Sequence, residues 1–141
     1  MSAIFEKQVQ LAQQRYEELM NRKNLIDDEW YNGCFERYKY PVLTSEHTPL
    51  IWRYDFNEAS NPFFMERLGI NAVFNPGAII INDTYYLVCR VEGYDRKSFF
   101  AVAESNNGID GFRFWDFPII RPQTDIPDTN VYDMRLILHR A

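Results

Sequence analysis

The sequence contains few of the residues that usually build a reactive centre or a metal site: two cysteines and two histidines among 141 residues. Cys34 and Cys89 lie far apart and form no CxxC motif, which fits neither a disulfide framework nor a zinc site. The simplest interpretation is two reduced cysteines with a packing role. His47 and His139 have no acidic partners at metal-ligand spacing, so a structural or surface role is favoured over a ligand role.

Long apolar runs and an excess of positive charge are also missing. Fifteen basic against twenty acidic residues give a net charge of 15 − 20 = −5, which disfavours nucleic acid and anionic membranes as partners. No apolar stretch approaches the ~18 residues of a membrane span, and the start MSAIFEKQVQ lacks the basic-then-apolar order of a secretory signal. We therefore expect a cytoplasmic protein.

Several catalytic motifs are absent: the serine nucleophile elbow, the Walker loop, HExxH and the EF-hand loop. The composition that remains is 46% hydrophobic, 25% charged and 16% aromatic, which is typical of a folded globular chain. Its length predicts one domain with a single core.

Residues 3–23 are predicted to form an amphipathic helix with Ser2 as its N-cap. Its apolar positions recur at steps of three and four: Phe5, Val9, Ala12, Tyr16 and Leu19. This stripe must be covered, either by the rest of the same chain or by another subunit. Residues 1–25 are thus a helical unit and a possible oligomerisation element.

Residues 26–70 mix aromatics with proline, asparagine and glycine, and predict a lead-in of extended segments and turns. From residue 71 the pattern changes to strands separated by short turns. The predicted strands are GAIII (77–81), TYYLVCRVE (84–92), SFFAVAES (98–105) and FRFWDF (112–117). They predict an antiparallel four-strand meander, in which Arg90 and Glu92 share one face of the second strand.

After a proline-rich connector, VYDMRLILHR (131–140) is predicted to begin another strand. A meander, a connector and a new strand are what one blade of a β-propeller and the start of the next would look like. The predicted fold is therefore all-β with an N-terminal helix, and residues 71–141 hold about one blade plus one strand. Since even four blades of ~40 residues need about 160 residues, we expect the chain to be incomplete.

A set of polar residues remains as candidates for chemistry: Asn75, Arg90, Glu92, Asp95, Arg96, Lys97 and Asp133. On the residues alone, RVEGYDRK (90–97) is as readily a charged surface turn as a binding site. Two alternatives stay open for Asp133: it is either a functional acid or a partner of Arg135 that orients the rim of a pocket.

Three stretches carry a family resemblance: HTPLIWRYDFNEASNPFFMERLGINAVFNPGAI, LVCRVEGYDRKSFFAVAESNNGIDGFRFWDFPI and TNVYDMRL. Together they cover about Tyr40 to Leu136, in order. They resemble the N-terminal part of the phosphorylases of glycoside hydrolase family 130, in particular the branch that acts on 4-O-β-mannosylglucose. The resemblance implies a five-bladed β-propeller with a central pocket for a terminal β-mannosyl unit. It implies no cofactor, with inorganic phosphate as co-substrate.

The resemblance also implies roles for individual residues. Asp133 in VYDMR would protonate the glycosidic oxygen through a hydroxyl of the mannose, and Asn75 and Arg90 would hold that mannose. Asp95 and Arg96 are further expected members of the sugar site. One acid suffices for inversion because phosphate arrives already anionic and nucleophilic. Pro76 departs from the small residue expected there and removes a backbone N–H.

The expected reaction converts 4-O-β-mannosylglucose and phosphate to α-mannose 1-phosphate and glucose, in a full-length enzyme that is a homo-oligomer. The family's phosphate-binding residues lie in later blades, so we expect these 141 residues alone to bind phosphate poorly and catalyse little. Two alternatives stay open: phosphorolysis of β-1,4-mannooligosaccharides, and a noncatalytic sugar-binding or assembly module.

Overall fold

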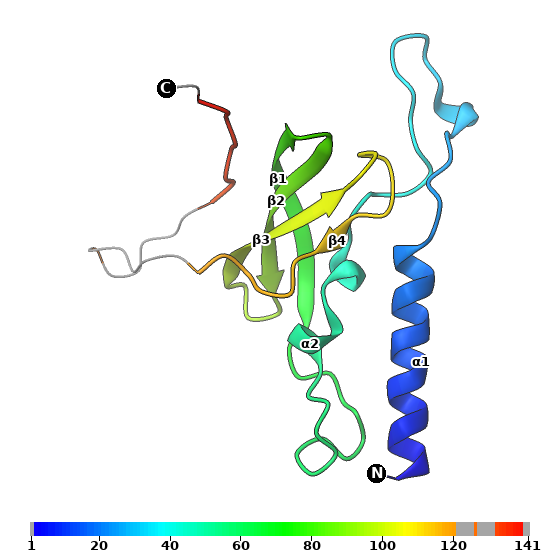
Figure 1. Ribbon diagram of the computed structural model, residues 1–141, viewed down its shortest axis with the longest axis vertical. Helices are drawn as coiled ribbons and strands as arrows, with labels where there is room; N and C mark the ends of the chain where they lie inside the picture. The colour runs from blue at the N-terminus through cyan, green and yellow to red at the C-terminus, as the bar shows by residue number, and fades with distance from the viewer. Residues whose placement is uncertain (1, 121–125, 127–131, 140–141) are drawn as a thin grey trace.

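The computed structural model describes residues 2–120, 126 and 132–139 (Figure 1). A long N-terminal helix lies on one side of a central sheet, and the C-terminal segment lies on the other (Figure 1). In the described part of the chain, no helix combines the length and apolar character that crossing a bilayer requires.

Helix α1 spans Ala3–Met20 and ends three residues before its predicted boundary. The Ser2 hydroxyl accepts a hydrogen bond from the Phe5 amide at 3.3 Å, which confirms the predicted N-cap. At the other end the amide of Asn21 bonds back to the Glu17 carbonyl at 3.0 Å, and the helix stops there.

The apolar stripe of α1 faces its own chain and is partly covered by it, since Val9, Ala12, Tyr16 and Leu19 stay half-buried. Phe5 is buried and meets the ring of Phe64 edge-on, with centroids 5.6 Å apart. The Tyr16 hydroxyl donates to the carbonyl of His47 at 3.5 Å, and the Glu17 carboxylate pairs with Arg113 at 3.0 Å. The helix therefore docks on its own chain through Phe5 and these polar contacts, and a second subunit covering the rest of the stripe stays a prediction.

The lead-in contains three short helical segments that the sequence pattern did not predict. These are η1 at Asp28–Trp30, η2 at Ser45–His47 and α2 at Leu50–Arg53. Each is four residues or fewer, too short for a 3.6-residue periodicity to register. Extended segments and turns connect them, as predicted, and a hairpin-like arm closed by the Ile26–Tyr38 bridge projects from the body (Figure 1).

The predicted meander is confirmed as one antiparallel sheet of order β1-β2-β3-β4. Its strands are β1 Ile70–Ile81, β2 Thr84–Gly93, β3 Ser98–Ser105 and β4 Arg113–Phe114. The first strand is longer than predicted and the last is shorter. Asn82 and Asp83 form the β1–β2 turn with φ of 49° and 61°, the left-handed geometry that a two-residue hairpin loop requires.

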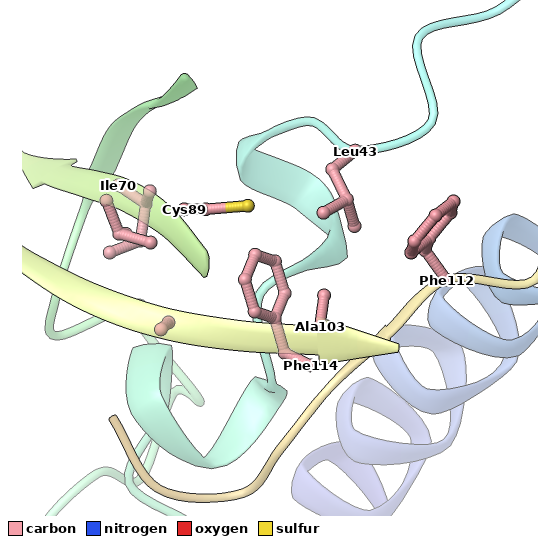
Figure 2. Close-up of a cluster of buried hydrophobic side chains, with 8 residues drawn as sticks. Leu43, Ile70, Cys89, Ala103, Phe112 and Phe114 are labelled. Atoms are coloured by element: carbon pink, nitrogen blue, oxygen red, sulfur yellow. The ribbon is translucent and has the colours of Figure 1, made fainter. Parts of the chain in front are cut away.

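One face of the sheet holds the main core, shown in Figure 2. Its buried members are Leu43, Ile70, Cys89, Val91, Ala101, Ala103, Phe112 and Phe114. The lead-in covers this face through Leu43 and the half-buried Trp52. Cys89 therefore packs as predicted, whereas Cys34 is exposed, so the packing role predicted for Cys34 is wrong.

The opposite face carries Val88, Phe100 and Val102, against which Met134 and Leu136 pack. Residues 132–139 do this without forming a strand, so the prediction of a strand over 131–140 is wrong for its described part. The Met134 carbonyl points over Gly77 on this face instead of joining a ladder at an edge. An extended segment laid across a sheet buries alternate side chains, as a strand does, but pairs no backbone.

Candidate functional site

The site begins at two irregularities of β1, each of which presents an asparagine. The register against β2 shifts between Ile70 and Ala72 and again between Phe74 and Gly77, so Asn71 and Asn75 both fall outside the ladder. An extra residue of this kind re-aims its side chain away from the regular alternation. Both asparagines reach a carboxylate.

Asn75 reaches Asp133. Its Nδ2 donates to Oδ1 and Oδ2 of that carboxylate, at 3.1 Å each. Asn75 adopts φ of 47° and Asp133 φ of 51°, left-handed geometry that asparagine and aspartate tolerate better than most residues. Pro76 lies in the same irregularity, outside the paired positions, so its missing N–H costs the sheet no ladder bond.

Arg90 is the second group beside Asp133. It lies in β2 directly across from Phe74, and its Nη1 is 3.9 Å from Asp133 Oδ1. Its Nε donates to Ser98 Oγ at 2.9 Å. The guanidinium also lies over the rings of Phe74 and Tyr132, 4.7 Å and 4.2 Å from their centroids, which favours a cation at this position.

Glu92 lies two residues further along the same strand face and is buried. Its carboxylate receives Asn71 Nδ2 at 2.9 Å, Arg90 Nη2 at 3.4 Å and Arg96 Nη1 at 3.3 Å. A buried carboxylate needs partners of this kind, because an unpaired charge is costly away from water. The predicted sharing of one face by Arg90 and Glu92 is confirmed.

Of the five predicted site residues, four meet in this network: Asn75, Arg90, Arg96 and Asp133. The fifth, Asp95, serves its own turn, where Oδ1 accepts the Lys97 amide at 3.0 Å. In the described part of the chain Asp95 has no hydrogen bond or ion pair to the other four.

The alternative pairing of Asp133 with Arg135 is wrong. The Arg135 guanidinium donates to the backbone carbonyls of Asp133 and Met134, at 3.3 Å and 3.2 Å, and leaves the carboxylate to Asn75 and Arg90. The reason is the backbone of Asp133, whose φ of 51° interrupts the extended conformation that would place its side chain on the same face as that of Arg135.

The charges of the cluster balance. Arg90 and Arg96 contribute two positive charges, and Glu92 and Asp133 contribute two negative charges, so the sum is 2 − 2 = 0. A balanced set of fixed donors and acceptors suits a neutral, hydroxyl-rich ligand better than an anion. A cleft of about 580 Å³ lies between α1 and α2, and none of these four residues lines it. Among the described residues, no group of three or more histidine, cysteine or acidic side chains could hold a metal ion.

No protein-family model matches the chain. A curated relative does: the chain is 55% identical over 137 residues to 4-O-beta-D-mannosyl-D-glucose phosphorylase from Bacteroides fragilis. The predicted similarity is confirmed. The aligned residues make up 97% of this chain but only 35% of that phosphorylase, so the chain spans about a third of the relative's length.

The network contains residues that sequence reasoning missed as members of the site, namely Asn71, Phe74, Ser98 and Tyr132. Phe74 lies directly across from Arg90 in the ladder, and Ser98 lies directly across from Glu92. Cross-strand neighbours on one face are in contact, so a correct strand register would have identified these two.

Proposed function

We propose that this chain contributes the mannose-binding face and the acid of an inverting β-mannoside phosphorylase of glycoside hydrolase family 130. The reaction is the conversion of 4-O-β-mannosylglucose and phosphate to α-mannose 1-phosphate and glucose. The observation that carries the proposal is the 55% identity to a mannosylglucose phosphorylase along 97% of the chain. The convergence of Asn75, Arg90 and Asp133 on one face supports it independently.

In the proposed mechanism Asp133 is the acid. It gives its proton to a hydroxyl of the bound mannose, which passes a proton on to the glycosidic oxygen as the bond from the anomeric carbon breaks. A phosphate oxygen forms the new bond from the opposite face of the sugar, and the configuration inverts. The proton that hydrogen phosphate loses on becoming an ester replaces the one that Asp133 gave up.

Asn75 and Arg90 are proposed to hold the mannose, with Arg96 at the rim of the site and Asp95 supporting its turn. The Asn75 amide and the Arg90 guanidinium flank the Asp133 carboxylate at 3.1 Å and 3.9 Å, so a sugar hydroxyl beside the acid would lie within reach of both. Fixed donors of this kind orient a polyol, which apolar contact alone does not.

The finer architecture belongs to the same proposal. The four-stranded sheet is one blade of a five-bladed propeller, and the residues that bind phosphate come from other blades. The complete enzyme is a cytoplasmic homo-oligomer to which α1 contributes.

A hybrid enzyme tests the proposal. In it, this chain replaces the aligned 137 residues of the Bacteroides fragilis phosphorylase. We expect the hybrid enzyme to release mannose 1-phosphate and glucose from mannosylglucose and phosphate. A folded hybrid enzyme that forms neither product, beside an active parent, would refute the proposed function.

The assignment of Asp133 is tested in the same hybrid enzyme. Asp133→Asn removes the transferable proton and should lower kcat by about 10² or more. The matched control is Asp83→Asn, which changes an exposed aspartate that also has positive φ, in the β1–β2 turn. Equal turnover in the two variants would remove Asp133 from its role.

A further inference from the structure

We propose that Glu92 is a positioning residue that holds both guanidinium groups of the site, Arg90 and Arg96, and keeps Arg90 from closing on the acid. This inference rests on the proposed function of the same site. Its basis is that one buried carboxylate lies within 3.4 Å of both arginines.

The position of Glu92 is itself fixed. The side chain is buried, and Asn71, displaced by the first irregularity of β1, donates to Oε1 at 2.9 Å. The backbone of Glu92 is paired on both sides, with Ala72 of β1 and Ser98 of β3. A carboxylate held in this way directs its remaining acceptor positions.

Arg90 is held at three places by groups that touch no substrate in the proposed mechanism. The Glu92 carboxylate accepts a hydrogen bond from Nη2, and the Ser98 hydroxyl accepts one from Nε at 2.9 Å. The guanidinium also lies over the rings of Phe74 and Tyr132. The remaining nitrogen, Nη1, faces Asp133 at 3.9 Å, which is beyond hydrogen-bond range.

That separation is the functional consequence of Glu92. A guanidinium free of other anions would approach the Asp133 carboxylate and form a direct, charge-assisted pair. Such a pair would occupy the donors meant for the sugar and the oxygens meant for proton transfer. Because Glu92 competes for the same cation, both groups stay available to a ligand.

Kinetics of the hybrid enzyme separate this role from general stability. Glu92→Gln should raise KM for mannosylglucose and lower kcat, each by about tenfold or more, because the reacting groups are misplaced. KM for phosphate should stay within about twofold, since the phosphate site is built elsewhere. A loss of stability alone would lower the amount of active enzyme without separating the two substrates.

The matched control is Glu104→Gln. Glu104 lies on the same sheet face near the C-terminal end of β3, and its carboxylate accepts a hydrogen bond from Trp115 Nε1 at 2.8 Å. The charge change is identical, and both KM values should remain unchanged. If Glu92→Gln behaves like Glu104→Gln in a hybrid enzyme that is otherwise active, the positioning role is overturned.

Two further measurements keep the test decisive if Glu92→Gln does not fold. Asn71→Ala removes the donor that fixes the Glu92 carboxylate and should raise KM for mannosylglucose severalfold; an unchanged value overturns the inference. In the 141-residue chain alone, the Arg90 guanidinium protons should exchange with water faster in Asn71→Ala than in Glu104→Gln. This second measurement needs no turnover, so it decides the positioning even if the unaltered hybrid enzyme proves inactive and the proposed function fails.

Discussion

The side-chain amide of Asn75 donates to both carboxylate oxygens of Asp133, at 3.1 Å each, across a sequence separation of 58 residues. One nitrogen thereby ties the first strand of the sheet to the C-terminal segment. The contact exists because the register shift after Phe74 turns Asn75 out of the ladder, and because Met134 and Leu136 fix the segment on the sheet.

Replacing Asn75 by aspartate should lower the turnover of the hybrid enzyme by about tenfold or more. The substitution keeps the shape of the side chain but places a second carboxylate against Asp133. The new carboxylate repels that of Asp133 and donates no hydrogen bond to it. Asn82→Asp is the control, because Asn82 also has positive φ but lies in the exposed turn. Steady-state rates of mannose 1-phosphate release compare the two, and equal rates would argue against a role of Asn75 at the acid.

A methyl group at Gly77 should detach the C-terminal segment from the sheet. A Cβ at this position would overlap the Met134 carbonyl oxygen, and the carbonyl carbon would lie 3.1 Å away. Nuclear Overhauser contacts between the side chains of Met134 and Leu136 and those of Val88 and Val102 should therefore be lost in Gly77→Ala, while the β2 amides stay protected from hydrogen exchange. Gly33→Ala adds the same methyl where nothing lies within 4 Å, and should leave this segment unchanged. Unaltered contacts in Gly77→Ala would mean that the segment does not rest on Gly77.

Stability should fall as the pH drops from neutrality towards 4, because of His47. Burial, reinforced by the charge of Arg22, lowers the pKa of His47 from 6.5 to about 4. Its Nδ1 also accepts the Thr44 amide at 3.0 Å, which a protonated ring nitrogen does not do. The unfolded chain binds this proton more tightly, so the contribution is complete above about pH 6.5 and disappears towards pH 4. It amounts to about 3 kcal/mol.

Denaturant unfolding at a series of pH values measures this effect. His47→Asn should flatten the dependence of the unfolding free energy between pH 7 and pH 5. His139→Asn, which changes the exposed histidine of the described segment, should retain the slope of the unaltered chain. An identical slope in all three proteins would exclude His47 as the titrating group.

Shortening Phe5 should loosen α1 from the body. Phe5 is 1% exposed and packs on Phe64, so Phe5→Ala should destabilise the docked helix by about 3 kcal/mol. Ile4→Ala removes a comparable side chain that is 72% exposed and should change stability by less than about 0.5 kcal/mol. Thermal melting curves of the two variants measure this difference in stability. Similar curves would indicate that α1 is held by something other than its own chain.

The two cysteines should differ in reactivity. Cys34 is exposed, whereas burial of Cys89 in the core raises the pKa of its thiol to about 12. A thiol reagent at pH 8 should therefore titrate one cysteine in the folded chain and two in denaturant, since the thiolate is the reactive form. Cys34→Ser should leave no fast phase, and a persisting fast phase would place Cys89 at the surface.

The sheet was predictable because its information is local. Strand alternation and the turn residues Asn82 and Asp83 lie within a few positions of the strands that they join. The full extent of β1 was not predictable, since Asn71 and Pro76 interrupt its pattern at the two irregularities. The failed strand has a related cause: Met134 and Leu136 face the sheet while Arg135 and Ile137 are exposed, and this alternation does not distinguish a ladder from an extended segment laid across a face.

The site could be predicted only in part from the residues. Arg90 and Glu92 share a face by strand period, but the approach of Asp133 to Asn75 depends on tertiary packing that spacing does not encode. Family resemblance assigned both residues to one sugar site but did not predict their contact. The aromatic rings over Arg90 were missed because Phe74 and Tyr132 read as ordinary apolar positions.

The meander pairs neighbours in sequence, whereas Asp133 joins it from far along the chain. During synthesis on the ribosome, Asn75, Arg90 and Glu92 emerge first and can form their hairpins with little loop-closure entropy. Asp133 arrives afterwards and settles on a surface already in place. In the proposed mechanism, holding the sugar and donating the proton are therefore separable properties, and a chain stopped just before Tyr132 would keep the sheet and lose the proposed proton donor.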